Sequence, residues 1–125
     1  MKKSIKIKWL DEPKESNYPA AKSYLNLIYD DVHVEKMITQ LLKAEVTAFK
    51  AKDIFRASSL SLLGVSNDRV ERDRKKIKDS EALSPILLVR DSVNGKVIIA
   101  DGYHRLCAVY SFDEDLEIPC KIVSL

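Results

Sequence analysis

Two kinds of hydrophobic spacing follow one another along the first third of this chain. Ile5, Ile7 and Trp9 alternate with lysines, which predicts a short, half-buried strand. From Pro19 the spacing becomes helical, and residues 32–44 carry a second helical stripe, so we expect two helices joined by a tight turn. The apolar positions of the two stripes are Ala21, Tyr24, Leu25 and Ile28, then Val34, Met37, Ile38, Leu41 and Leu42.

The middle of the chain predicts a strand over residues 46–49 that runs into a short turn or helix. An apolar connector ending at Gly64 follows. The next segment has Ser66 or Asn67 as N-cap, acidic residues early and basic residues late, an order that suits the helix dipole. Its few apolar residues predict that only a narrow stripe of this helix is buried. They include Val70 and Ile77, one heptad apart.

The same helix carries a run of basic residues that raises the question of nucleic-acid binding. Four acidic residues interleave with them, so we expect a solvated helix face rather than a binding patch. The basic residues are Arg72, Arg74, Lys75, Lys76 and Lys78, and the acidic ones are Asp68, Glu71, Asp73 and Asp79.

The last third of the chain predicts a hairpin, a helix and a final strand. The near-continuous apolar run after Pro85 is typical of a strand covered on both faces, and Asn94-Gly95 supplies the hairpin turn. A return strand leads into a helix over 101–112, and the last strand places Ile118, Cys120 and Ile122 on one face. The fold class is therefore α+β, with a small mixed sheet and flanking helices plus the N-terminal helical pair.

Composition limits the classes of protein to consider. A length of 125 residues fits a single domain, 1–125, with an N-terminal extension (1–45) and a core (46–125). A net charge of +2 is too small to imply a nucleic-acid or membrane partner, and no stretch approaches the length of a membrane span. The two cysteines form no CxxC pair and no metal-ligand spacing occurs, so we expect a reduced, cytoplasmic protein without a metal site of its own.

The turn Asp101-Gly102-Tyr103-His104-Arg105 is the strongest candidate for chemistry. A helix N-terminus has amides without intrahelical partners and binds anions readily, and Gly102 permits close approach of a ligand. His104 and Arg105 add donors in the first turn, which predicts a phosphate site. The alternative is purely structural: Asp101 is an N-cap and Asp-Gly only a turn.

The remaining candidates for chemistry have structural interpretations. Leu106, Cys107 and Tyr110 share a helix face with Tyr103, so Cys107 is expected in the core, as is Cys120 among the isoleucines of the last strand. His33 has no neighbouring cysteine or histidine, and we expect it at the surface.

Over residues 46–123 the chain resembles the ParB/sulfiredoxin superfamily. The stretch "SPILLVRDSVNGKVIIADGYHRLCAVYSFDEDLEIPCKIV" follows its pattern of strand, hairpin, glycine motif, helix and Ile-Pro strand. The resemblance implies a ParB/sulfiredoxin-like fold in which the motif holds the phosphates of CTP, ATP or another adenine nucleotide. By this resemblance, Gly102, His104 and Arg105 are expected to contact the phosphates.

Departures from the family pattern limit what the resemblance implies. Tyr103 stands where sulfiredoxin has its reactive cysteine, so sulfinic-acid repair is not expected. We do not expect the DNA-reading helix-turn-helix of ParB proteins, because only about twenty residues follow the motif. The motif is most similar to that of archaeal free-serine kinases, but their catalytic glutamate has no counterpart in "FKAKDIFRASSL". Asp101 and Asp53 remain as candidates for a general base.

Three functions stay open at this point. The first is a phosphotransferase or nucleoside triphosphatase, with Gly102, His104 and Arg105 on the phosphates, Asp101 or Asp53 as base, and Mg²⁺ with ATP, ADP or CTP. The second is a non-catalytic module that keeps the nucleotide pocket and docks to a protein partner through the N-terminal helical pair. The third is a ParB-like nuclease or nucleic-acid binder, against which the charge balance argues.

Overall fold

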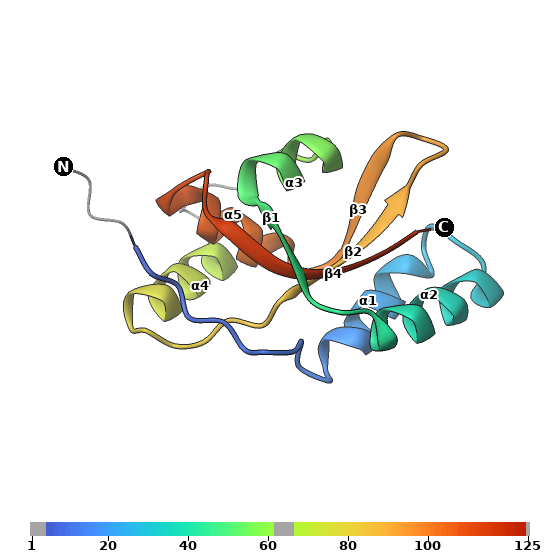
Figure 1. Ribbon diagram of the computed structural model, residues 1–125, viewed down its shortest axis with the longest axis horizontal. Helices are drawn as coiled ribbons and strands as arrows, with labels where there is room; N and C mark the ends of the chain where they lie inside the picture. Colours follow the sequence, from blue (N-terminus) through green and yellow to red (C-terminus); the bar gives the residue numbers. More distant parts are fainter. Residues whose placement is uncertain (1–4, 62–66, 125) are drawn as a thin grey trace.

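The computed structural model describes residues 5–61 and 67–124, and within them it is an α+β protein with five helices and a four-stranded mixed sheet (Figure 1). This confirms the predicted fold class at the level of α+β. The helices are α1 (Asn17–Leu25), α2 (Asp31–Lys43), α3 (Ala51–Ser58), α4 (Asp68–Lys78) and α5 (Tyr103–Phe112). The strands are β1 (Thr47–Lys50), β2 (Ile86–Asp91), β3 (Lys96–Asp101) and β4 (Glu117–Ser124).

The sheet has the strand order β1-β4-β2-β3. β2 and β3 form the predicted antiparallel hairpin, whose turn ends at Gly95 with a left-handed φ of 64°. β4 returns beside β2 in parallel, with Leu88 opposite Ile122, and its other edge pairs with β1 in the antiparallel sense. The helix α5 makes the crossover that a parallel β2–β4 pair requires.

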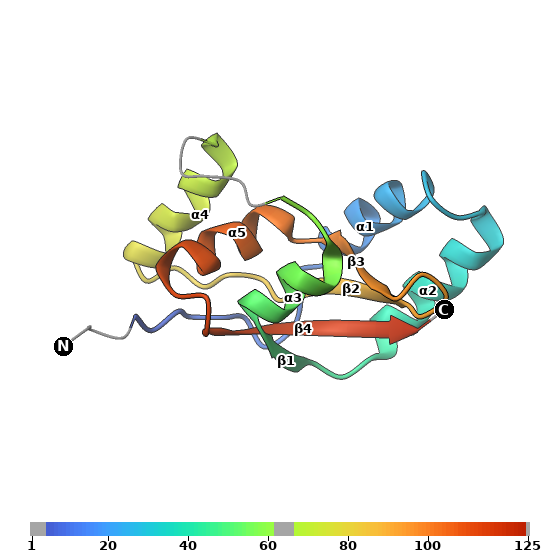
Figure 2. The same ribbon diagram turned by 90° about the horizontal axis from the view of Figure 1, so that it is seen from above.

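Each face of the sheet has its own hydrophobic core, because side chains alternate along every strand. Ile86 and Leu88 of β2 belong to the core shared with α3, α4 and α5. Leu87 and Val89 belong to the core on the other face, which α1 and α2 cover. Figure 2 shows α4 and α5 toward one end of the sheet and α1 and α2 toward the other, with α3 over the strands. β2 is thus covered on both faces, as its apolar run predicts.

Lys121 links the N-terminal helical pair to the sheet. This residue of β4 is 1% exposed, and its Nζ donates to the carbonyl of Leu42 at 3.2 Å. The same Nζ lies 3.4 Å from the Glu12 carboxylate and over the ring of Tyr18. The buried ammonium therefore joins β4, α1, α2 and the segment before them.

Three predictions about the N-terminal part are wrong in detail. Residues 5–9 do not form a strand. A single bridge joins Trp9 to Leu83, because the segment after Leu83 turns away into β2. The first helix begins at Asn17 and ends at Leu25, which leaves Ile28 outside it, 45% exposed. Leu42 of the second helix is also 55% exposed, since the buried residues of this helix are Val34, Met37 and Leu41.

The middle of the chain follows its prediction where the structure describes it. β1 covers residues 47–50 against a predicted 46–49, and α4 begins after Asn67. The other N-cap candidate, Ser66, and the end of the connector at Gly64 lie outside the described residues. No helix among residues 5–61 and 67–124 has the length and apolar character to cross a membrane.

Candidate functional site

The N-terminus of α5 is shaped by Gly102. β3 ends at Asp101, and Gly102 then takes a left-handed φ of 112° as the N-cap of the helix. A Cβ at this position would lie 2.7 Å from Cβ of Ile86 and still closer to its Cγ2, so only glycine fits. No side chain caps this helix end. The structural alternative, with Asp101 as the N-cap, is therefore wrong.

The helix α4 turns one face toward this end of α5. Asn67 caps α4 by accepting from the amides of Arg69 and Val70. Val70 and Ile77 are buried in the core shared with α5, which confirms the narrow stripe and fixes the rotation of α4. Arg69, Asp73 and Lys76 follow at spacings of four and three residues, so they share one helix face.

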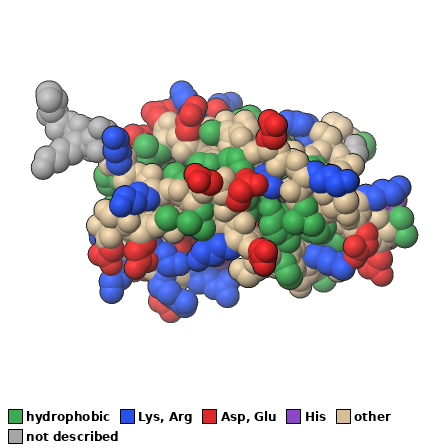
Figure 3. Space-filling model, turned by 60° about the horizontal axis from the view of Figure 1, so that its bottom comes forward, with side chains coloured by type: hydrophobic (Ala, Val, Ile, Leu, Met, Phe, Trp, Pro, Cys, Tyr) green, Lys and Arg blue, Asp and Glu red, His purple; other side chains and the backbone are tan. Residues whose placement is uncertain are grey.

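These side chains and the α5 turn form a polar pocket of about 290 Å³. We call it the cation pocket, because four of its residues are lysine or arginine. It is lined by Arg69, Arg72, Asp73, Lys76, Asp101, Gly102, His104 and Arg105. Lys and Arg side chains gather toward the lower left of the face drawn in Figure 3, the end of the molecule that carries α4.

The expectation that the basic run of α4 is a solvated face is wrong for Arg74, whose side chain is 18% exposed, whereas Arg72 is exposed as expected. Arg72 and Lys76 line the cation pocket. Arg74 lies over the ring of Phe112, 4.3 Å from its centroid, and donates to the hydroxyl of Ser111. Packing against α5 thus separates the basic residues of α4 by the side of the helix they occupy.

Arg105 has only part of its donor capacity satisfied by the protein. Its Nη2 donates to Oδ2 of Asp101 at 3.0 Å, and the two side chains are 17% and 20% exposed. Its Nε is buried and finds no acceptor among the described residues. A buried guanidinium nitrogen without a partner is costly, so the site favours an anion that would accept from it. Asp101 acts here as the group that positions Arg105.

Burial shifts the pKa of two titratable groups in the cation pocket. Burial lowers the pKa of His104 below its usual value, and the positive charge of Arg69 lowers it further. His104 is therefore neutral at pH 7 in the free protein. Burial raises the pKa of the Asp73 carboxyl, against the opposing effect of Lys76, Arg105 and His104. The Asp73 carboxyl therefore binds a proton more readily than an aspartate in water does.

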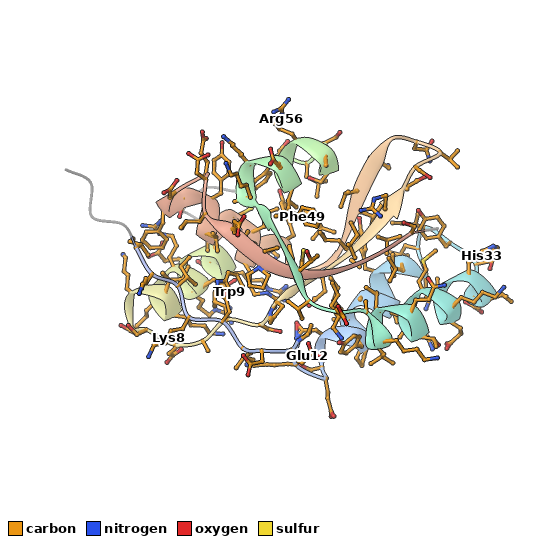
Figure 4. The ribbon with its side chains drawn as sticks, in the orientation of Figure 1. Lys8, Trp9, Glu12, His33, Phe49 and Arg56 are labelled. Atoms are coloured by element: carbon orange, nitrogen blue, oxygen red, sulfur yellow. The ribbon has the colours of Figure 1, made fainter. Side chains whose placement is uncertain are left out.

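The structure brings Gly102, His104 and Arg105 together with Asp101 but places Asp53 elsewhere. Asp53 of α3 lines a separate, mostly apolar hollow together with Phe49 and Arg90. Figure 4 labels Phe49, which marks the position of this hollow.

The other singled-out residues lie where their structural interpretations predict. Cys107 and Cys120 are buried, and burial raises the pKa of the Cys120 thiol to about 12. His33 is exposed at the start of α2, at the opposite end of the molecule from α4 (Figure 4). The hydroxyl of Tyr103 donates to the carbonyl of Ser61.

Arg69, Arg72, Asp73 and Lys76 are the site residues that the sequence prediction missed. The signal for them was present in the spacing of Val70 and Ile77, which determines the face that α4 turns to its neighbour. The spacing does not determine which element is that neighbour. Nothing in the local pattern says that α4 packs on α5 rather than on another helix.

Comparisons with known proteins leave the site to be judged on its geometry. No family model, no curated protein and no solved structure matches the chain. Among the described residues, no group of three or more histidine, cysteine or acidic side chains is arranged to hold a metal ion.

Proposed function

We propose that the cation pocket binds the phosphate groups of a nucleotide. The observation that carries the proposal is that four cationic side chains, from α4 and α5, meet at a helix N-terminus that no side chain caps. The amides and dipole of α5 and the unpartnered Nε of Arg105 supply donors of the kind that phosphate oxygens accept.

The charge of the pocket fits more than one phosphate. Arg69, Arg72, Lys76 and Arg105 outnumber the carboxylates of Asp73 and Asp101, and the Asp101 charge is already paired with Arg105. A volume of about 290 Å³ accommodates a phosphate chain.

The resemblance of residues 46–123 supports a nucleotide over other phosphate compounds, and with it a ParB/sulfiredoxin-like fold. Gly102, His104 and Arg105, the residues carried over by that resemblance, all line the pocket. The residues that line the cation pocket do not build a Mg²⁺ site by themselves, because its two carboxylates stand among four cations. Mg²⁺ with ATP, ADP or CTP would arrive bound to the phosphates.

One observation favours turnover of the nucleotide as a second function. Asp73 lines the cation pocket beside His104, and among the described residues it forms no ion pair within 4.0 Å. A carboxylate with a raised pKa at a phosphate site fits a general base for a phosphotransferase or nucleoside triphosphatase. Asp73 replaces Asp53 in this role, since Asp53 lines another hollow, and Asp101 is held by Arg105.

The test is a thermal-shift titration with ATP, ADP, CTP and GTP, each with and without Mg²⁺. We expect at least one nucleotide to raise the melting temperature of the wild type and to have much less effect on Arg105→Ala or Lys76→Ala. Lys75→Ala is the matched control, because Lys75 is the neighbour of Lys76 on α4 but lines a different surface hollow. Equal shifts in the three variants would refute the site.

Assays of phosphate release and of DNA binding, added to this titration, distinguish the remaining functions. Release of phosphate from a bound nucleotide, lost in Asp73→Asn, supports the enzyme. A bound and unchanged nucleotide supports a module that acts through a protein partner, with the α1–α2 pair as its docking surface. Salt-sensitive binding of a DNA duplex with no nucleotide response would replace the proposal by nucleic-acid binding.

A further inference from the structure

A groove runs along the free edge of the sheet. β3 is the last strand in the order β1-β4-β2-β3, and among the described residues it pairs with β2 alone. A groove of about 350 Å³ contacts four consecutive residues of β3, from Lys96 to Ile99. Because neighbouring strand residues point to opposite faces, a groove that contacts all four lies along the edge of the strand.

The assignment of these residues to the two cores confirms that position. Val97 and Ile99 pack with the core under α3, whereas Ile98 packs with the core under α1 and α2. The walls of the groove match this division. Tyr24 and Ile28, at the end of α1 and in the turn after it, form one wall, and Leu60 after α3 forms the other. All three wall residues are between 42% and 45% exposed.

We propose that this edge groove binds an extended peptide segment of a partner protein, which adds to β3 as a fifth strand. The outward-facing N–H and C=O groups of an edge strand are a template for another strand. A segment paired with β3 would turn alternate side chains toward Tyr24 and Ile28 on one side and toward Leu60 on the other. Apolar residues on both faces of the segment therefore fit the walls.

The charge of the edge groove adds a requirement for an acidic residue. Its lining contains the charged side chains of Asp91 and Lys96. Asp91 is 4% exposed, and its carboxylate already accepts from Asn94 and from the hydroxyl of Tyr29. Lys96 is exposed and forms no ion pair within 4.0 Å with any described residue. Its charge lowers the pKa of the buried Asp91 carboxyl, and it is the accessible charge of the groove. A carboxylate in the peptide near the turn end of β3 would complement it.

The shape of the edge groove favours a peptide over a second copy of this chain. Two copies that paired through β3 would each bring the same protruding walls, Tyr24 with Ile28 and Leu60, to the contact. A single extended strand has no such walls and fits between them. The edge groove shares no lining residue with the cation pocket, so this inference is independent of the proposed function.

In the experiment, a displayed library of random octapeptides is selected for binding to the full-length protein. We expect enriched peptides with alternating apolar residues and an acidic residue toward one end. Synthesised as a free peptide, the best of them should slow hydrogen exchange of amides within Lys96–Asp101. Ile28→Asp should weaken its binding about tenfold, because it puts a charge into an apolar wall. Leu27→Asp is the matched control, since Leu27 is the exposed neighbour outside the edge groove and its variant should bind normally.

A second variant tests the charge requirement without changing the walls. Selection on Lys96→Glu should replace the acidic residue of the enriched peptides by a basic one. No enrichment, equal weakening by Ile28→Asp and Leu27→Asp, or unchanged exchange in β3 would each overturn the proposal. Protection of β3 that rises with protein concentration, together with a dimer in sedimentation, would assign the edge to a second copy instead.

Discussion

The chemistry of the cation pocket depends on how single residues are constrained. Arg105 is held on one side by Asp101 at 3.0 Å, which orients the guanidinium and offsets part of its charge. Its Nε remains without an acceptor among the described residues. The pair leaves the backbone amides at the start of α5 unblocked by any side-chain cap. An internal ion pair therefore positions the arginine for an anion.

Gly102 gives the first prediction, because both its φ of 112° and its contact with Ile86 exclude a side chain. Gly102→Ala should lower the free energy of unfolding by about 3 kcal/mol, from backbone strain and overpacking together. Gly95→Ala is the control: its φ is also left-handed, at 64°, but nothing lies within 4 Å of the added Cβ, so the loss should be about 1 kcal/mol. Urea unfolding of the two variants measures the difference, and equal losses would contradict the close-contact argument.

His104 gives a prediction of pH dependence. Burial and Arg69 lower its pKa below the usual 6.5, so it is neutral at pH 7, whereas a bound anion favours the protonated form. Anion affinity should therefore increase as the pH falls from 7, and this increase should require His104. Sulfate is a suitable probe, because it does not titrate in this range, and calorimetry also measures the proton taken up. His104→Gln should remove that proton uptake; the same uptake in the variant would assign it to another group.

At the scale of elements, local patterns predicted where most helices and strands lie, but not which face each turns to its neighbours. The hairpin, α2, α4 and α5 follow from hydrophobic spacing and from the cap at Asn67. Residues 5–9 have the alternation of a strand and form only a bridge, because a strand also needs a partner along its length. The place of Arg72 and Lys76 in the cation pocket could not be predicted for the same reason, since it depends on the contact between α4 and α5.

Asn67 tests α4 as an element, because the helix carries three of the four cations of the pocket. Asn67→Ala removes the side-chain oxygen that caps the amides of Arg69 and Val70, and it should cost about 1 kcal/mol of stability. It should also weaken anion binding, since the first turn of α4 holds Arg69. Asp30→Ala removes the corresponding cap from α2, far from the pocket, and should lower stability similarly without changing anion affinity. Equal effects of the two variants on affinity would show that α4 does not carry the site.

At the scale of the whole molecule, the sheet is shared by two cores. The apolar run of β2 predicts cover on both faces, but it does not predict which helices supply that cover. The spacing of the N-terminal stripes predicts helices, but it does not say that they cover Leu87, Val89 and Ile98 of the sheet. Lys121 is buried because Leu42 and Glu12, which are distant from it in sequence, lie against its ammonium. Long-range packing determines both features.

Because the N-terminal helical pair and the remaining helices cover the same sheet, we expect the protein to unfold in one transition. The fluorescence of Trp9, the only tryptophan, reports on the core with α5, while far-UV circular dichroism reports on all helices. The two signals should give coincident urea curves. Lys121→Ala should shift both curves together and lower stability by about 3 kcal/mol, because it leaves a cavity and an unpaired carbonyl at Leu42. Lys121→Met keeps the buried stem and should cost only about 1 kcal/mol. Separate transitions in the wild type, or a shift of one signal alone in Lys121→Ala, would mean that the helices α1 and α2 fold independently of the core with α5.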